Sequence, residues 1–501
     1  MKTIKLFMMA ALVLMTAACS SDDNDITTPT PQPVKPEGIT ITATLAPKNG
    51  GDDTRGLSNG TNKIVATWDK DEKIAILYEV GGVKKKAEAT VTAVNTETGA
   101  ATIQFTVDSN TTDNTTCTLV FPYTAAKDDN TGVKDAATLL ANQTGSLTSE
   151  FMDVRVGAGT IQINNPGLTV TTQPAAQNAI FQIKAKTPNF LISLNTLTVT
   201  IDGNEYAVNL ANGSGWSEIY IALPPVTDKK VSFLAKDVNG RMFGYSKSGV
   251  TFAAGKYYIS ELTMEYVFSV GADKRVCFSQ GNLQYDGSTW KFAENQWGIL
   301  DYNGTYNTSS AYPIDLFTWG NTTLGAKDYM GTGYDTYSST LKNTQAPGAA
   351  NSSTGSDWGY NAISNGGSKN SQWRTLTISE WNYLLTERTG VSHSYTVGQS
   401  INGIKGLVIY PDGYKGDAYS GSDWETFEHN GCVFLPAGGY RNGQNVTSHS
   451  NSGYYWSASC SGSSGTAYFL EFNSSSLNIH TTWTGDANKG YGYSVRLVRD
   501  L

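Results

Sequence analysis

The residues that could support catalysis are few in this sequence and lie far apart. No His-Glu-x-x-His pattern, which zinc hydrolysis needs on one helix face, joins any of the four histidines, His393, His429, His449 and His480. The sequence also lacks a Gly-x-Ser-x-Gly elbow and any Cys-x-x-Cys pair. Carboxylates are numerous, so a glycosidase-type pair is the enzymatic alternative that inspection leaves open. We therefore expect no enzyme, and modification and binding are the chemistry to consider.

Cys19 is the residue whose surroundings predict a covalent modification. A positively charged start is followed by an apolar run, residues 6–15, and small residues lead to Cys19. The run is too short for a permanent membrane span, which needs roughly 20 residues, so residues 1–18 are typical of a signal peptide. The Ala-Ala-Cys sequence resembles the lipobox of bacterial lipoproteins, although Thr16 stands where Leu is usual. This resemblance implies that Cys19 is acylated and anchors the chain in the outer membrane; ordinary secretion is the alternative.

Residues 19–37 have the composition of a disordered tether. Acidic residues follow the cysteine, and a Thr/Pro-rich stretch follows them; such composition cannot bury a core, and proline stiffens it. The acidic cluster resembles the signal that sends lipoproteins to the outer face of the outer membrane. It favours display at the cell surface over a tether that is merely solvated.

Length and charge limit the remaining classes. With 501 residues the chain has room for about three domains. Only 16% of the residues are charged and 51 are glycine, a composition typical of extracellular β-structure with many turns. The net charge of −8 becomes −10 once Lys2 and Lys5 leave with the signal peptide. Binding to nucleic acid needs a basic surface, so we expect no nucleic-acid partner.

Short strands with turn residues between them predict a β-sandwich over residues 38–144. The first strand alternates apolar residues with threonines, its inward face being Ile39, Ile41, Ala43 and Leu45. A Gly/Asp/Asn-rich loop containing Arg55 follows. Further strands are expected at 64–68, 73–78, 87–94, 101–107 and 117–121.

A second block of strands, residues 145–267, predicts another sandwich. Arg55 in its polar loop, Trp68 and Ile74-Ala75-Ile76, together with the later Glu218 to Pro225 and Ala254 to Tyr258, resemble the fimbrillin-like proteins. That family consists of lipoproteins of bacterial pili with two β-sandwiches of transthyretin-like type. The resemblance covers residues 38–266.

This resemblance implies a role for Arg55 and for the strand before it. In fimbrillins an arginine-specific protease cuts in this loop, the first strand leaves, and a strand of another pilin subunit enters the vacated groove by donor-strand exchange. The alternative is a permanent first strand followed by a solvated arginine.

The third region, residues 268–501, has a different composition. It contains nine of the eleven tryptophans, and a capping box from Thr377 to Glu380 predicts a helix. The segments Trp373 to Leu384, Phe434 to Arg441, Gly453 to Ser457 and Ser494 to Arg499 resemble the FISUMP-type domains, whose fold is similar to C-type lectins. The expected fold class is therefore mainly β, with two tandem fimbrillin-type sandwiches followed by an α+β C-type-lectin-like domain.

Tryptophans in the loops of this region are the candidate ligand-binding residues. Aromatic faces beside carboxylates suit carbohydrates, and core packing is the alternative; the candidates are Trp319, Trp358, Trp424 and Trp483. For Trp373, Trp381 and Trp456 we expect core packing. The Glu-Pro-Asn and Trp-Asn-Asp motifs of calcium-binding lectins are absent, so no metal site or cofactor is predicted, with calcium left open. The redox state of Cys432 and Cys460 is also left open.

These observations lead to one hypothesis and one rival. A subunit that accepts a strand but continues into a lectin-like domain would end a pilus, so we expect a tip or accessory adhesin on the cell surface. Its partners would be other pilin subunits and a glycan or protein on a host or microbial surface. The rival is a glycan-binding lipoprotein that stays tethered at Cys19 and does not polymerise.

Overall fold

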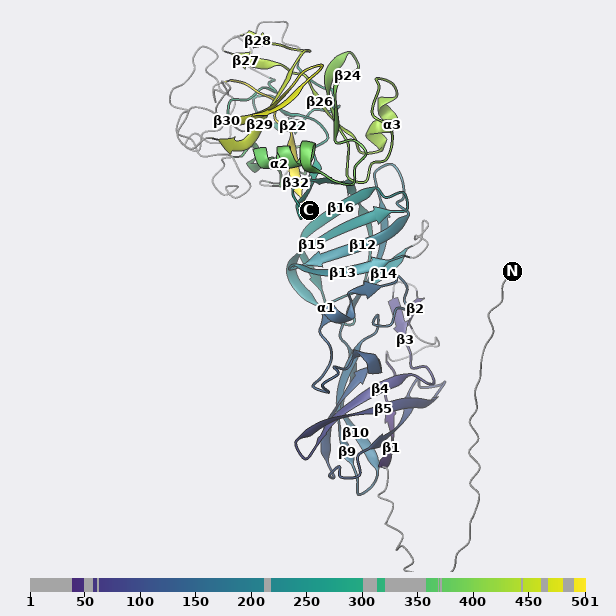
Figure 1. Ribbon diagram of the computed structural model, residues 1–501. Helices are drawn as coiled ribbons and strands as arrows, with labels where there is room; N and C mark the ends of the chain where they lie inside the picture. Colours follow the sequence, from purple (N-terminus) through teal and green to yellow (C-terminus); the bar gives the residue numbers. More distant parts are fainter. Residues whose placement is uncertain are drawn as a thin grey trace, which may run out of the picture.

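A computed structural model describes residues 38–48, 57–60, 63–210, 218–300, 313–319, 357–367, 369, 372–442, 445–460, 467–480 and 491–501. Cys19, Arg55 and Trp483 lie outside these residues. The described chain is mainly β and forms three bodies in a row, with the second between the first and the third (Figure 1). No helix in the described ranges is both long and apolar enough to cross a membrane.

The first body is built from one seven-stranded sheet in the order β1-β6-β5-β4-β7-β9-β10. The strands are β1 (Ile39–Leu45), β4 (Lys73–Val80), β5 (Val83–Val94), β6 (Ala101–Val107), β7 (Thr115–Phe121), β9 (Arg155–Gln162) and β10 (Gly167–Ala176). The sheet curls until its two edge strands, β1 and β10, come close to each other. The two layers of the expected sandwich are therefore halves of a single sheet, and their inward side chains form one core.

Local sequence explains this sheet. Alternating apolar and polar residues place one face of each strand in the core and the other in solvent. Gly81 and Gly82 both have positive φ, +56° and +80°, which is the backbone that a two-residue hairpin between β4 and β5 requires. A separate hairpin of β2 (Leu57–Gly60) and β3 (Lys63–Ala66) precedes β4.

The second body is a sandwich of two sheets. The larger has the order β18-β16-β15-β12-β13-β8 and the smaller β14-β11-β17, in which β11 and β17 run parallel. Their bounds are β8 (Asn142–Gln143), β11 (Ala179–Lys186), β12 (Leu194–Ile201), β13 (Asn204–Asn209), β14 (Ile219–Leu223), β15 (Val226–Asp237), β16 (Met242–Phe252), β17 (Tyr257–Thr263) and β18 (Glu265–Tyr266). The core between the sheets is formed by residues such as Phe181, Val199, Ile221 and Phe233.

The boundary expected at 144/145 is wrong, because the first two bodies exchange segments. β8 pairs with β13 in the second body, after η1 (Tyr123–Ala125) and α1 (Ala136–Leu139). The chain then returns to the first body, where β9 pairs with β7 and β10 completes the sheet. Leu139 and Leu140 pack in the core of the second body, so neither body is formed by one continuous segment.

The third body consists of small sheets and short helices. Its sheets are β19-β20-β32-β23, β24-β25-β26 and β29-β30-β31, with the hairpins β21-β22 and β27-β28. The strands are β19 (Phe268–Ser269), β20 (Arg275–Phe278), β21 (Leu283–Tyr285), β22 (Trp290–Phe292), β23 (Arg374–Thr375), β24 (Tyr395–Ile401), β25 (Ile404–Ile409), β26 (Val433–Pro436), β27 (Tyr440–Asn442), β28 (Asn445–Thr447), β29 (Gly453–Cys460), β30 (Ala467–Phe472), β31 (Leu477–His480) and β32 (Leu497–Asp500). The helices are η5 (Trp358–Tyr360), α2 (Ile378–Asn382), the π-helical η6 (Tyr383–Glu387) and α3 (Trp424–His429). The capping box predicted at Thr377 and Glu380 is confirmed, and it starts α2.

The second and third bodies are joined by direct contacts. The hydroxyl of Tyr266 donates to the carbonyl of His429 at 2.8 Å, and the Met242 amide donates to the Asp412 carbonyl at 3.3 Å. The Arg499 guanidinium forms an ion pair of 2.7 Å with Glu265. Contacts between backbones and through an ion pair hold the two bodies together.

Candidate strand-acceptor site

β1 is an edge strand whose inward side chains fill one side of the first core. Among the described strands it pairs with β6 alone, antiparallel, with Ile41 opposite Phe105 and Ala43 opposite Ile103. Ile41 and Leu45 are fully buried, Ala43 is buried and Ile39 is half-buried, while the threonines between them are exposed. Removal of β1 would open an apolar groove beside the unpaired edge of β6, and an edge of this kind can bind another strand.

The chain after β1 is held by a buried lysine. The side chain of Lys48 is only 2% exposed, and its ammonium donates to the two carboxylate oxygens of Glu72 at 3.0 and 3.2 Å. Asp153 lies 3.4 Å from the same nitrogen. The ammonium also lies 4.4 Å from the ring centroid of Trp68 and 3.9 Å from that of Phe121, within the range of a cation–π contact.

Backbone contacts add to this attachment. The Trp68 indole donates to the Ala46 carbonyl at 2.9 Å, and Arg155 donates to the Lys48 carbonyl at 2.9 Å. Arg155 is buried and also pairs with Asp153 at 2.8 Å. Residues 46–48 are thus bound to the segment before β4 and to the start of β9, in addition to the pairing of β1 with β6.

The electrostatics of this cluster depend on Lys48. Burial raises the pKa of Glu72 above its ordinary value, and the nearby Lys48 charge and a hydrogen bond from the Asp69 amide oppose that rise. The cation therefore favours the charged form of the carboxylate. Sequence reasoning identified β1 but not this cluster, because Lys48, Glu72 and Asp153 lie in separate turns and no spacing pattern joins them.

Three of the four candidate ligand-binding tryptophans are buried, which corrects the expectation for them. Trp319 and Trp358 have no exposed surface, and Trp424 is 7% exposed. The Trp319 indole donates to the Ser457 carbonyl at 2.8 Å, and Trp424 packs edge-on against Tyr419. These rings are part of the hydrophobic core beneath glycine-rich loops, so their faces cannot stack on a ligand. Core packing is confirmed for Trp373, Trp381 and Trp456.

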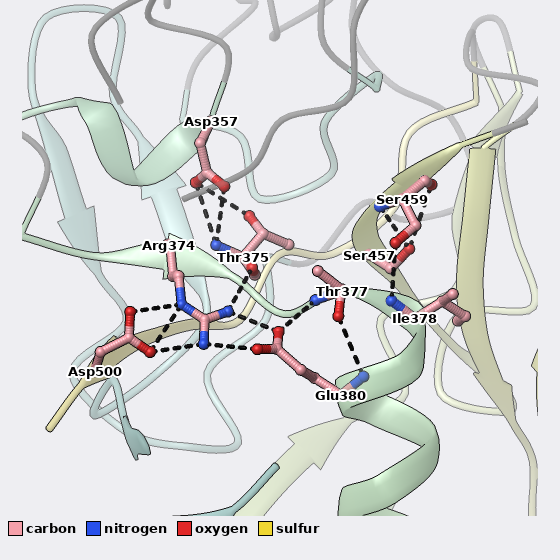
Figure 2. A network of polar contacts seen from close by, with 9 residues as sticks. All are labelled: Asp357, Arg374, Thr375, Thr377, Ile378, Glu380, Ser457, Ser459 and Asp500. Carbon is pink, nitrogen blue, oxygen red and sulfur yellow. Dashed lines mark hydrogen bonds and ion pairs between the residues drawn. The ribbon is translucent and has the colours of Figure 1, made fainter. Parts of the chain in front are cut away.

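A polar network in the third body, seen in Figure 2, is structural. Arg374 donates to Glu380 at 2.7 and 2.9 Å and to Asp500 at 2.7 to 3.0 Å, so it joins β23, α2 and β32. Asp357 accepts from the amide of Thr375, as Figure 2 shows, and also from the amide of Gly359. Burial raises the pKa of Asp357 above its ordinary value. Every carboxylate in this view is occupied by protein donors.

No cluster of three metal-ligating side chains occurs among the described residues. Cys432 is a free, buried thiol, whereas the side chain of Cys460 lies outside the described part of the chain.

Three half-buried tyrosines pack against the core of the third body. Tyr440 lies 5.0 Å from Tyr454 and 5.6 Å from Tyr491, measured between ring centroids. They come from β27, β29 and the segment before β32. The hairpin that carries Tyr440 lies at the end of the third body away from the second (Figure 1). We call Tyr440, Tyr454 and Tyr491 the tyrosine cluster.

Comparison with known proteins gives few matches. The family described as a domain of unknown function (DUF8237) matches residues 422–498. No curated protein matches the chain. Among solved structures, the chain is similar to a putative cell adhesion protein from Bacteroides ovatus, with 15% identity and a TM-score of 0.27, covering 53% of this chain and 99% of that one. A fimbrial protein from the same species is 12% identical with a TM-score of 0.23, covering 92% and 99%. The minor pilin GBS52 of Streptococcus agalactiae is 11% identical with a TM-score of 0.21, covering 45% and 95%.

Proposed function

We propose that this protein is a surface-exported pilus subunit of the tip or accessory type. Its first body would accept a strand from another subunit after cleavage at Arg55, and its third body would bind a target. The observation that carries this proposal is β1, an alternating edge strand that pairs with β6 alone among the described strands. Acylation at Cys19 would bring the chain to the outer membrane before cleavage removes residues 19–55.

The position of the expected cut explains why exchange would need it. β1 and Lys48 lie before Arg55, and β2 lies after it. In the uncut chain, β1 is tethered and returns to its groove at a high effective concentration. After the cut, β1 is a separate peptide, and a competing strand can replace it.

The packing of β32 supports a subunit that accepts a strand but does not donate β32 to another subunit. β32 lies between β20 and β23, and Arg374 holds Asp500. Lys230 of the second body donates to the Leu501 carbonyl at 3.1 Å. Withdrawing β32 would break the sheet and its attachment to the second body.

For the third body we propose a glycan or protein target at the tyrosine cluster. Half-buried rings offer apolar faces together with hydroxyl groups, which suits sugar rings and polar surfaces. A glycan array with residues 20–501 tests this. Tyr440→Ala should abolish any hits, whereas Tyr383→Ala, in η6, should leave them unchanged; absence of hits would leave a protein target.

Limited proteolysis tests the strand-acceptor role. An arginine-specific protease should cut the folded chain after Arg55, as shown by intact mass, and Arg55→Gln should resist at that position. Many other arginines are protected by burial, namely Arg155, Arg374, Arg388, Arg441 and Arg496. The cut chain should then form a higher-mass complex with a pilin that donates a strand. An acylated chain that stays uncut and monomeric on cells would refute this role and favour the tethered lipoprotein.

A further inference from the structure

The Lys48 ammonium lies in a pocket lined by two aromatic rings and two carboxylates. The lining residues are Trp68, Glu72, Phe121 and Asp153, and we call this site the ammonium pocket. The two rings stand edge to face, 5.3 Å apart at 81°, and the carboxylates complete the surround. The pocket belongs to β4, β7, β9 and the turns before them, so it stays with the body of the protein when β1 departs.

Departure of β1 would remove one partner from each of several buried groups. Glu72 and Asp153 would lose the cation, the Trp68 indole would lose the Ala46 carbonyl, and Arg155 would lose the Lys48 carbonyl. A buried charge without its partner is strongly unfavourable. Any strand supplies carbonyl groups, but only a side chain can replace the ammonium.

We infer that the strand entering this groove carries a lysine whose ammonium takes the place of that of Lys48. This inference rests on the proposed strand-acceptor function and adds the chemistry of the partner. Apolar residues that match Ile41, Ala43 and Leu45 fill the groove, and the lysine lies beyond the end of that apolar series, at the end of the groove nearest Trp68. A strand with the direction of β1 has the lysine three positions after its last buried apolar residue.

The geometry selects lysine over other residues. A neutral side chain leaves Glu72 without a cation and leaves Asp153 with Arg155 alone. Arginine is poorly matched because a planar guanidinium is wider than an ammonium. Arg155 already lies beside the pocket, where it contacts Asp153 and the Lys48 carbonyl.

Labelled peptides test the inference on the full exported chain with Cys19→Ser, cut after Arg55. The probes are the peptide of residues 38–48, the same peptide with Lys48→Met, and the same peptide with Thr44→Met. Thr44 is exposed in β1, so this last peptide controls for the added apolar side chain. The measured quantity is the label retained after gel filtration, with the uncut chain as background.

We expect the 38–48 and Thr44→Met peptides to be retained alike. The Lys48→Met peptide should bind at least about tenfold more weakly, because it loses the hydrogen bonds to a charged group. Equal retention of all three peptides would overturn the inference and leave the strand-acceptor function intact. Retention of none by the cut chain would overturn both.

A change in the receptor gives an independent test. In the chain with Glu72→Gln and Asp153→Asn, the two carboxylates are neutral. The ratio of retained 38–48 peptide to retained Lys48→Met peptide should then fall to about one, because a double-mutant cycle isolates the contact between the peptide lysine and these carboxylates. Retention of the Lys48→Met peptide by this variant shows that its groove is folded. If the preference for lysine persisted, the carboxylates would not be its source and the inference would fail.

Discussion

The contacts of Lys48 lead to a prediction about the uncut chain. Lys48→Met removes the cation between Glu72 and Asp153 and leaves two carboxylates in a largely buried setting. We expect the first body to lose about 3 kcal/mol of unfolding free energy, the range seen when one partner of a buried ion pair is removed. Urea unfolding followed by hydrogen exchange in β4 to β7 measures it.

The matched control is Lys73→Met. Lys73 pairs with Glu88 at 2.6 Å, but both side chains are well exposed. Its loss should change the unfolding free energy by less than about 0.5 kcal/mol. Similar losses in both variants would mean that burial of the Lys48 pair does not matter.

A second prediction concerns pH and Glu72. The groups facing this carboxylate are Lys48 and Asp69, and Asp153 and Arg155 complete the cluster. In the folded chain the pKa of Glu72 lies above its ordinary value because burial, the largest cause, outweighs the Lys48 charge. Unfolding returns the carboxylate to water and its pKa to the ordinary value, so the folded state binds more protons between the two pKa values. The contribution of Glu72 to the unfolding free energy should therefore decrease as pH rises through this window, and urea unfolding at a series of pH values measures it.

The Glu72→Gln variant should lose that pH dependence. A steep dependence that survives in it would assign the proton to another group. Above the raised pKa, the contribution of Glu72 in the unchanged chain should be constant.

For some residues, the sequence did not predict whether the side chain is buried or exposed. Trp319, Trp358 and Trp424 lie in segments rich in glycine and polar residues, which made ligand contact a reasonable expectation. Such segments have few other large side chains, so the indoles supply the core volume instead. The ammonium pocket could not be predicted either, because its members meet only after three distant turns have folded together.

At the scale of elements, release of β1 should be visible in β6. Backbone amides of β6 (Ala101–Val107) that face β1 lose their partners on release, whereas those that face β5 keep theirs. We therefore expect fast hydrogen exchange at alternate β6 amides in the cut, strand-depleted chain. Adding the 38–48 peptide should restore protection. Uniform loss of protection along β6 and β5 would instead mean that the first body unfolds without β1.

Strands of strong alternation were predictable, and the way they are shared between bodies was not. The strand expected at 39–45 matches β1, and that at 101–107 matches β6. Period-two patterns mark buried faces wherever a strand lies. They do not say which sheet a strand joins: β9 and β10 lie within the range expected for the second sandwich, 145–267, but they pair with the first body.

For the whole molecule, the contact between the second and third bodies determines how the tyrosine cluster is held. Gly413 lies so close to the second body that a Cβ there would be 2.0 Å from the Gly240 carbonyl oxygen. Tyr266 and Glu265 bond across the same contact. The two bodies are therefore in direct contact, and the contact fixes the third body against the second.

Gly413→Ala should therefore separate the two bodies. Both Gly413 and Gly421 have positive φ, +76° and +100°, so an alanine costs about 1 kcal/mol of backbone strain at either position. Only at Gly413 does the added methyl group also meet the backbone of the other body, since nothing lies within 4 Å of a Cβ at Gly421. We expect small-angle scattering to show a larger radius of gyration for Gly413→Ala, and faster proteolysis near residue 267, with Gly421→Ala close to the unchanged chain. If the two variants behaved alike, strain within the third body would account for both, and the joint would not depend on this contact.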